Sequence, residues 1–171
     1  IGIGQTESRG VRKGVVINLD ATIDAVKRVV EEAELMAGVE IGSAYVGLAG
    51  SHVRGFNSRG VIAVSGQNRV IGREDVARVI EAAKAVSIPV DREILHVLPQ
   101  EFVVDDQDGI GDPTGMTGTR LEVNVHVITC ASTAAQKTIT GVNRAGLEVI
   151  DTVLTQLAAA EEFGRASCRE R

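Results

Sequence analysis

The sequence predicts an α/β protein in which one unit is interrupted by an inserted strand-helix-strand-strand module of the α+β type. Apolar residues recur at helical spacing in three segments, and short apolar or alternating runs typical of strands separate these segments. The strand-helix-strand-strand order of residues 50–130 lies between two stretches, 1–49 and 131–162, that together form a β-α-β-like unit. Insertion of such a module at a surface loop is physically well tolerated.

The first stretch contains the clearest helix of the chain. The segment DATIDAVKRVVEEAELMAG has apolar residues at helical spacing, with Asp20 placed to cap its N-terminus and Gly38 to end it. The apolar run from Ala44 to Gly50 predicts a buried strand. The opening IGIG predicts the end of a further strand, and we expect the chain to be an interior fragment of a larger protein.

The second stretch continues the same unit. STAAQKTITGVNRAG predicts a helix capped by Ser132 and closed by Gly146, LEVI a short strand, and DTVLTQLAAAEE the start of another helix. The ending FGRASCRER, residues 163–171, breaks the preceding apolar periodicity. We therefore expect residues 163–171 to be a non-native tail.

The inserted module is predicted from four patterns. A strand is expected at about residues 60–65, followed by the amphipathic helix GREDVARVIEAAKAV, with Val86 on its apolar face and Pro89 as its stop. REILHVLPQEFVVDD predicts a long strand, in which Pro99 indicates an edge or a bulge. In RLEVNVHVITCA, apolar and polar residues alternate as in a strand with one buried face: Leu121, Val123, Val125 and Val127 against Glu122, Asn124 and His126.

Composition limits the classes of function. The 171 residues carry a net charge of -5, which gives no electrostatic reason to expect nucleic acid or an anionic membrane surface as the main partner. No apolar run approaches the roughly 20 residues that a membrane span needs. With only Cys130 and Cys168, we expect a cytoplasmic, reducing setting without structural disulfides.

The stretch HVLPQEFVVDDQDGIGDPTGMTG has the composition of a metal or phosphate loop. A calcium-loop count from Asp106 fails, because the fifth position is Ile110, which has no side-chain oxygen, and the twelfth is Thr117, where a bidentate glutamate is required. No glycine-lysine-serine or -threonine ending precedes a helix, and the histidines, cysteines and serines lack catalytic spacing. We therefore predict neither catalytic nor metal-binding residues, and we interpret the stretch as a loop between two antiparallel strands.

Several longer segments occur in the order in which they occur in one family: SRGVRKGVVINLDAT, VEEAELMAGVEI, YVGLAGSH, ILHVLPQEFVVDDQDGI, PTGMTGTRLEVNVHVIT and GLEVIDTVLTQLA. Over nearly all of residues 1–160 the chain thus resembles the FtsA family of bacterial cell-division proteins. The resemblance implies an actin-like (ribonuclease H-like) fold, with part of subdomain 1A at 1–49 and 131–162. It also implies that residues 50–130 are the inserted, SHS2-like subdomain 1C.

The resemblance implies a full-length protein that binds ATP with Mg²⁺, polymerises into actin-like filaments and is at most a weak ATPase. Such a protein tethers FtsZ to the inner face of the cytoplasmic membrane through a C-terminal amphipathic helix and recruits late division proteins at the septum. The family's phosphate loops are expected outside residues 1–160, so no ATP-contacting residue is assigned. The candidate protein-contact residues are Asp105, Asp106, Asp108 and Arg120.

Three other classes share parts of this pattern. A pilus-assembly ATPase of the PilM type also carries an inserted module, but LHVLPQEF and AELMAG favour FtsA. A sugar-kinase-branch enzyme would need a catalytic carboxylate beside its phosphate loops. A free-standing ligand-binding module remains compatible with the strand-helix-strand-strand unit alone.

Overall fold

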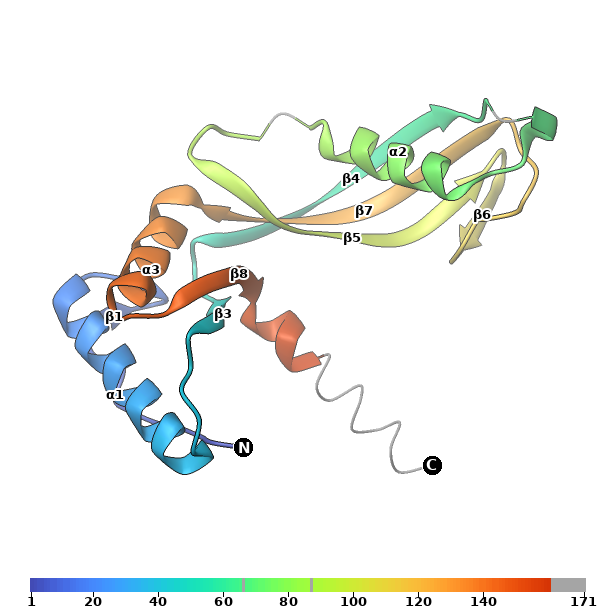
Figure 1. The fold of residues 1–171 in the computed structure, drawn as a ribbon. Coiled ribbons are helices and arrows are strands. Elements are labelled where there is room, and N and C mark those ends of the chain that lie inside the picture. The colour runs from blue at the N-terminus through green and yellow to red at the C-terminus, as the bar shows by residue number, and fades with distance from the viewer. Residues whose placement is uncertain (66, 87, 161–171) are drawn as a thin grey trace. The chain divides into compact units, whose positions relative to one another are not determined.

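The computed structural model describes residues 1–65, 67–86 and 88–160, so the tail expected at 163–171 lies outside the described residues. The chain divides into two compact units (Figure 1). We call Ile1–Val53, together with the chain from Cys130 onward, the outer unit, and Arg54–Thr129 the inserted module.

The outer unit combines two helices with two small sheets. Its elements are β1 (Val11–Arg12), β2 (Val15–Val16), α1 (Leu19–Ala37), β3 (Ser43–Leu48), α3 (Ser132–Arg144) and β8 (Glu148–Leu154). β3 pairs with β8 in parallel, β1 pairs with β2 in an antiparallel hairpin, and α1 contacts α3. The predicted α/β class is therefore confirmed, with a parallel pair formed by strands that lie on either side of the insertion in sequence.

Two of the predicted helix caps are wrong. Asn18, not Asp20, caps α1: its backbone is extended, and its side chain accepts a hydrogen bond from the amide of Ala21 at 3.1 Å. Ser132 is already the first residue of α3, after Ala131 in the cap position. Gly38 ends α1 as predicted, with a φ of 71° that glycine adopts without steric cost.

Two strand predictions for the outer unit also need correction. Residues 1–9 contain no strand, so the IGIG prediction is wrong. β8 runs on to Leu154, and the following helix begins at residue 155 instead of 151. The β-branched residues of DTV favour the extended form and explain the longer strand.

The inserted module is a four-stranded sheet with a helix on one face. Its elements are β4 (Val53–Ala63), a short 3-10 helix η1 (Gln67–Arg69), α2 (Arg73–Lys84), β5 (Arg92–Val104), β6 (Gln107–Ile110) and β7 (Arg120–Ala131), in the sheet order β4-β7-β5-β6. The strand-helix-strand-strand order is confirmed, but β6 is an additional strand, and β4 begins earlier than expected. α2 ends at Lys84, so Val86, 42% exposed, is not part of its apolar face.

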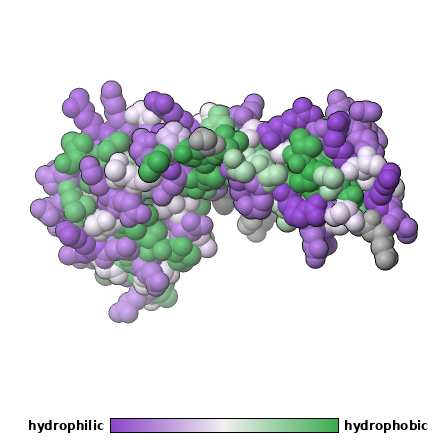
Figure 2. All heavy atoms as spheres, turned by 90° about the horizontal axis from the view of Figure 1, so that it is seen from above, coloured by the Kyte–Doolittle hydropathy of each residue, from purple (hydrophilic) through white to green (hydrophobic). Residues whose placement is uncertain are grey.

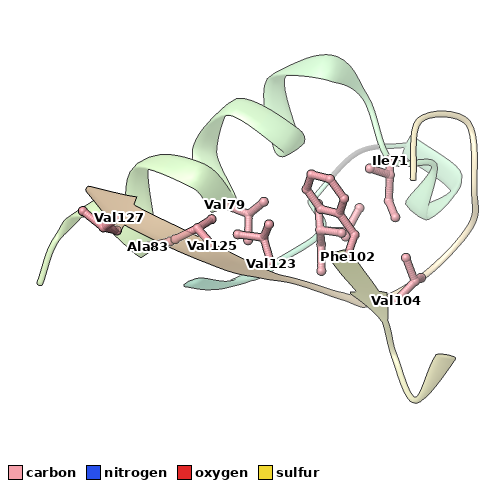
Figure 3. Close-up of a cluster of buried hydrophobic side chains, with 10 residues drawn as sticks. Ile71, Val79, Ala83, Phe102, Val104, Val123, Val125 and Val127 are labelled. Atoms are coloured by element: carbon pink, nitrogen blue, oxygen red, sulfur yellow. The ribbon is translucent and has the colours of Figure 1, made fainter. Parts of the chain in front are cut away.

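The core of the module lies between α2 and the sheet. The alternating residues of β7 are at most 1% exposed, and they pack with Val79 and Ala83 of α2 and with Phe102 of β5 (Figure 3). Burying one such side chain contributes about 1.5–3 kcal/mol. Gly60 lets the helix approach β4 closely, because a Cβ at this position would lie 2.2 Å from the carbonyl oxygen of Val79.

Pro99 marks both an edge and an irregularity in β5. Among the described strands, β6 pairs with β5 only at Phe102 and Val104, so the outer edge of β5 is open at Pro99. Val97 and Phe102 both pack against the core although they lie five positions apart, where strict alternation would place them on opposite faces. Proline has no backbone N–H to donate, and its absence is tolerated on an open strand edge.

Hydrophobic residues gather in patches among hydrophilic ones on the face presented in Figure 2. In the outer unit, Leu35, Met36 and Val39 at the end of α1 are 87%, 60% and 62% exposed. No described helix combines the length and apolarity that crossing a membrane requires.

Candidate protein-interaction site

The four candidate contact residues lie at one end of the module's sheet. Asp105 and Asp106 form the two-residue turn between β5 and β6, and Val104 pairs with Gln107 across it. Asp108 belongs to β6, so it lies in a strand and not in the predicted loop. Arg120 is the first residue of β7.

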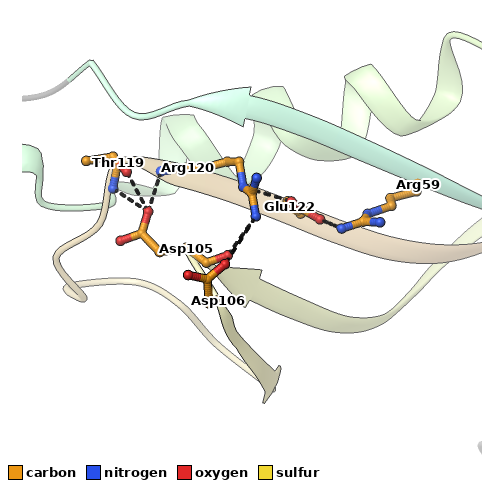
Figure 4. Close-up of polar contacts among 6 residues, drawn as sticks. All are labelled: Arg59, Asp105, Asp106, Thr119, Arg120 and Glu122. Atoms are coloured by element: carbon orange, nitrogen blue, oxygen red, sulfur yellow. Dashed lines mark hydrogen bonds and ion pairs between the residues drawn. The ribbon is translucent and has the colours of Figure 1, made fainter.

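Asp105 is bound to the beginning of β7 through its side chain and its backbone (Figure 4). One carboxylate oxygen accepts hydrogen bonds from the backbone amide and hydroxyl of Thr119, at 3.0 and 2.6 Å, and from the amide of Arg120 at 3.0 Å. The Asp105 amide donates to the carbonyl oxygen of Arg120 at 2.9 Å. These bonds hold Asp105 at a φ of 53°, a conformation that aspartate tolerates better than most residues.

The hydrogen bonds lower the pKa of Asp105, chiefly the bond from the Thr119 hydroxyl and then those from the amides of Thr119 and Arg120. Bonds from the side chain and backbone of Thr114 likewise lower the pKa of Asp112. In both cases the ionised carboxylate is the form that the native structure stabilises.

Arg120 is the centre of a charge network that sequence reasoning did not assemble. Its Nε lies 2.9 Å from Glu122 Oε1, and its Nη2 donates to the Asp105 carbonyl oxygen at 3.0 Å and lies 3.7 Å from Asp106 Oδ1. Glu122 is only 2% exposed and also pairs with Arg59 of β4. The alternation of β7 had placed Glu122 on the polar face, but its burial depends on two arginines.

We expect Glu122→Gln to lower the free energy of unfolding of the module by about 1–2 kcal/mol, because it weakens two ion pairs of a buried carboxylate. This expected loss of stability is smaller than for a fully buried ion pair, because the side chains of Arg59 and Arg120 are 60% and 51% exposed. Pulsed hydrogen exchange in urea, followed on peptides from residues 54–129, measures the change. The control Glu81→Gln removes an exposed partner of Lys84 and should cost less than about 0.5 kcal/mol; equal costs would contradict the expectation.

The lowered pKa of Asp105 predicts a pH dependence of stability. Its contribution is present above the unfolded-state pKa of about 4 and is lost as the pH falls through the lower folded-state value. Asp105→Asn should therefore be less stable than the wild type at pH 7, with a difference that shrinks towards pH 3.

The urea midpoint of the module at several pH values checks this expectation. Asp108→Asn is the control, because the side chain of Asp108 makes no hydrogen bond or ion pair within the described part of the chain. If the urea midpoints of Asp105→Asn and the wild type differ by the same amount from pH 7 to pH 3, the lowered pKa of Asp105 is contradicted.

The glycines of this region do not form a phosphate cradle. A Cβ added at Gly109, Gly111 or Gly115 would meet no atom within 4 Å, and the segment leads into a strand, not a helix. Among the described residues, no group of three or more histidines, cysteines, aspartates or glutamates is arranged to hold a metal ion. What this end of the sheet presents is a set of exposed charges.

Comparison with known proteins agrees with the fold. Residues 50–129 match the family described as the SHS2 domain inserted in FtsA. A chain in the solved PilM-PilN type IV pilus biogenesis complex superposes with a TM-score of 0.56 over 90% of this chain and 39% of that chain, at 16% identity. This likeness concerns the fold alone. The structure thus defines a class: an actin-like fold, present in part, that carries an inserted SHS2-type module.

Sequence similarity identifies the family within this class. The chain is 48% identical to cell division protein FtsA of Pseudomonas aeruginosa, 52% to that of Borreliella burgdorferi and 38% to that of Escherichia coli, each over 160 residues. These matches cover 94% of this chain but only 38%, 39% and 38% of the relatives. Over the part that it spans, the chain belongs to the FtsA family.

Proposed function

We propose that the protein to which this chain belongs is an actin-like scaffold of bacterial cell division. It tethers FtsZ filaments to the inner face of the cytoplasmic membrane, polymerises in an ATP-dependent manner and recruits later division proteins. The inserted module, which corresponds to subdomain 1C, supplies contacts for self-association and recruitment, and the outer unit corresponds to part of subdomain 1A.

The observation that carries this proposal is that similarity to division proteins extends through both units. The 160 matched residues include the outer unit as well as the module, so the likeness is not restricted to a widely shared insertion. The pilus-assembly alternative is supported only by fold, since the identity to the PilM-PilN chain is 16%. A sugar-kinase role has no candidate catalytic carboxylate within the described residues.

ATP with Mg²⁺ belongs to the whole protein in this proposal. The family's phosphate loops are expected outside residues 1–160, so no residue of this chain is assigned to the nucleotide. The chain itself contributes a compact module whose exposed charges, Asp106, Asp108 and Arg120, are available to a partner. In this proposal the chain binds other proteins, and no chemical step is assigned to its residues.

Reconstitution tests the proposal. In the P. aeruginosa relative, the matched segment is replaced by residues 1–160 of this chain, and the chimera is mixed with FtsZ, anionic lipid vesicles and ATP. We expect FtsZ to sediment with the vesicles as it does with the unmodified relative. A folded chimera that binds vesicles but leaves FtsZ in the supernatant would contradict the proposal.

A further inference from the structure

We propose that the outer unit carries both halves of a contact between copies of this chain: a groove at the C-terminal end of α1 binds the β1–β2 hairpin of a second copy. The groove combines apolar side chains with an acidic rim, and the hairpin carries exposed basic side chains. The inference rests on the self-association in the proposed function and adds to it an interface outside the inserted module.

The groove lies where α1 ends. It has a volume of about 540 Å³ and is lined by two apolar side chains, a glycine and three glutamates: Leu35, Val39, Gly38, Glu31, Glu34 and Glu40. Leu35 and Val39 are 87% and 62% exposed, and Met36, next to Leu35 in the sequence, is 60% exposed. Apolar side chains that are exposed together in this way are typical of protein–protein contact surfaces.

The rim of the groove favours a cationic occupant. The last turn of α1 has no basic residue, and the C-terminal end of a helix carries a partial negative charge of its own. One carboxylate oxygen of Glu34 already accepts a hydrogen bond from the amide of Ile41 at 2.7 Å. Glu31 and Glu40 are exposed, and their side chains make no hydrogen bond or ion pair among residues 1–65, 67–86 and 88–160. Basic side chains from outside would therefore meet two available carboxylates and the negative end of the helix.

The β1–β2 hairpin has the complementary charge. Arg12 and Lys13, at its turn, are exposed and form no ion pair with the described residues. The turn is packed closely on the chain, because a Cβ at Gly14 would lie 1.7 Å from the carbonyl oxygen of Ala49. Ile17, directly after β2, is 68% exposed. The hairpin thus offers two cations for the rim of the groove and an apolar side chain for its interior.

The two surfaces cannot meet within one copy. They lie at opposite ends of α1, whose 19 residues span about 28 Å at 1.5 Å per residue (Figure 1). The hairpin of one copy therefore reaches only the groove of another copy. Each copy in such a pair keeps one unused surface, a groove or a hairpin, so that the head-to-tail contact can extend into a chain of copies.

Charge reversal tests the contact in the 171-residue chain. The groove variant carries Glu31→Lys/Glu40→Lys, and the hairpin variant carries Arg12→Glu/Lys13→Glu. Sedimentation velocity should show self-association of the wild type that weakens at high salt. Each variant alone should associate at least about tenfold more weakly, because like charges then face each other. An equimolar mixture of the two variants should associate again, because every groove then meets a hairpin of opposite charge.

Two further variants separate the contributions to this contact. Leu35→Ser/Val39→Ser removes apolar side chains without changing a charge and should also weaken association about tenfold. Glu74→Lys/Glu81→Lys is the control, because it makes the same change of charge on α2 in the inserted module, and it should associate as the wild type does. Hydrogen exchange in α1 shows whether each variant is folded before it is mixed.

A wild type that stays monomeric at its highest soluble concentration would overturn this interface and leave the groove to a basic segment of another protein. A folded pair of variants that does not associate when mixed would overturn it as well. Association that survives in both charge variants but is lost in Asp106→Asn/Asp108→Asn would overturn it in favour of the module contact in the proposed function. The sedimentation of FtsZ with vesicles decides the proposed function independently of these outcomes.

Discussion

Replacing Gly60 by alanine should lower the free energy of unfolding of the inserted module by about 3 kcal/mol, the upper part of the range for overpacked cores. The new Cβ would lie 2.2 Å from the carbonyl oxygen of Val79 and 2.7 Å from the amide nitrogen of Ala83. Both atoms belong to the backbone of α2, so the helix would have to move away from β4 and would lose contacts along the core.

The measurement is pulsed hydrogen exchange in urea on peptides from residues 54–129 of the 171-residue chain, which reports on the module separately from the outer unit. Gly111→Ala is the matched control, because its Cβ would meet no atom within 4 Å and its φ is not positive. If both variants unfold at the same urea concentration, α2 does not pack on β4 as described.

The second large effect is expected for Phe102→Ala, at about 4 kcal/mol. Phe102 is 6% exposed, and its ring lies between α2 and the sheet, beside Val79 and Val123 (Figure 3). Truncation removes the ring's transfer free energy and leaves a cavity that valines held on two rigid layers cannot fill.

The same exchange measurement checks this value, and Val61→Ala is its control. Val61 is also on a strand of the sheet but is 49% exposed, so its truncation should cost less than about 0.5 kcal/mol. A cost below about 1 kcal/mol for Phe102→Ala would mean that the core is loosely packed.

Periodicity was sufficient to predict the main elements. α1 and β7 were predictable because their apolar residues repeat at helical spacing and at every second position. In β7 those residues are buried, whereas in α1 they are half-buried or exposed. The α1 cap was harder, because Asn18 and Asp20 are both good cap formers two positions apart. Only the backbone conformation, extended at Asn18, distinguishes them.

β6 was missed for a different reason. QDGI contains one apolar residue and a glycine, which is a weak strand signal, and the turn before it lacks the usual glycine. The turn forms because Asp105 obtains its hydrogen bonds from Thr119 and Arg120, which lie 14 and 15 positions further along the chain. Such a tertiary contact has no local signature in the sequence.

The candidate site could be predicted only in part. Arg120 and the aspartates stand out by composition, and the structure brings Arg120 together with Asp105 and Asp106. Arg59 and Glu122 form an ion pair although they lie 63 positions apart in the sequence. They meet because β4 lies beside β7 in the sheet. Without knowledge of that strand order, the sequence indicates only that Glu122 is a polar residue on the outer face of a strand.

The most direct test of a division role is the length of P. aeruginosa cells that are depleted of their own FtsA and express the chimera carrying residues 1–160 of this chain. We predict division at close to normal length, because the chain matches that relative along both units. Long filaments without septa, in cells where the chimera accumulates to the normal level, would contradict a role for this chain in cell division.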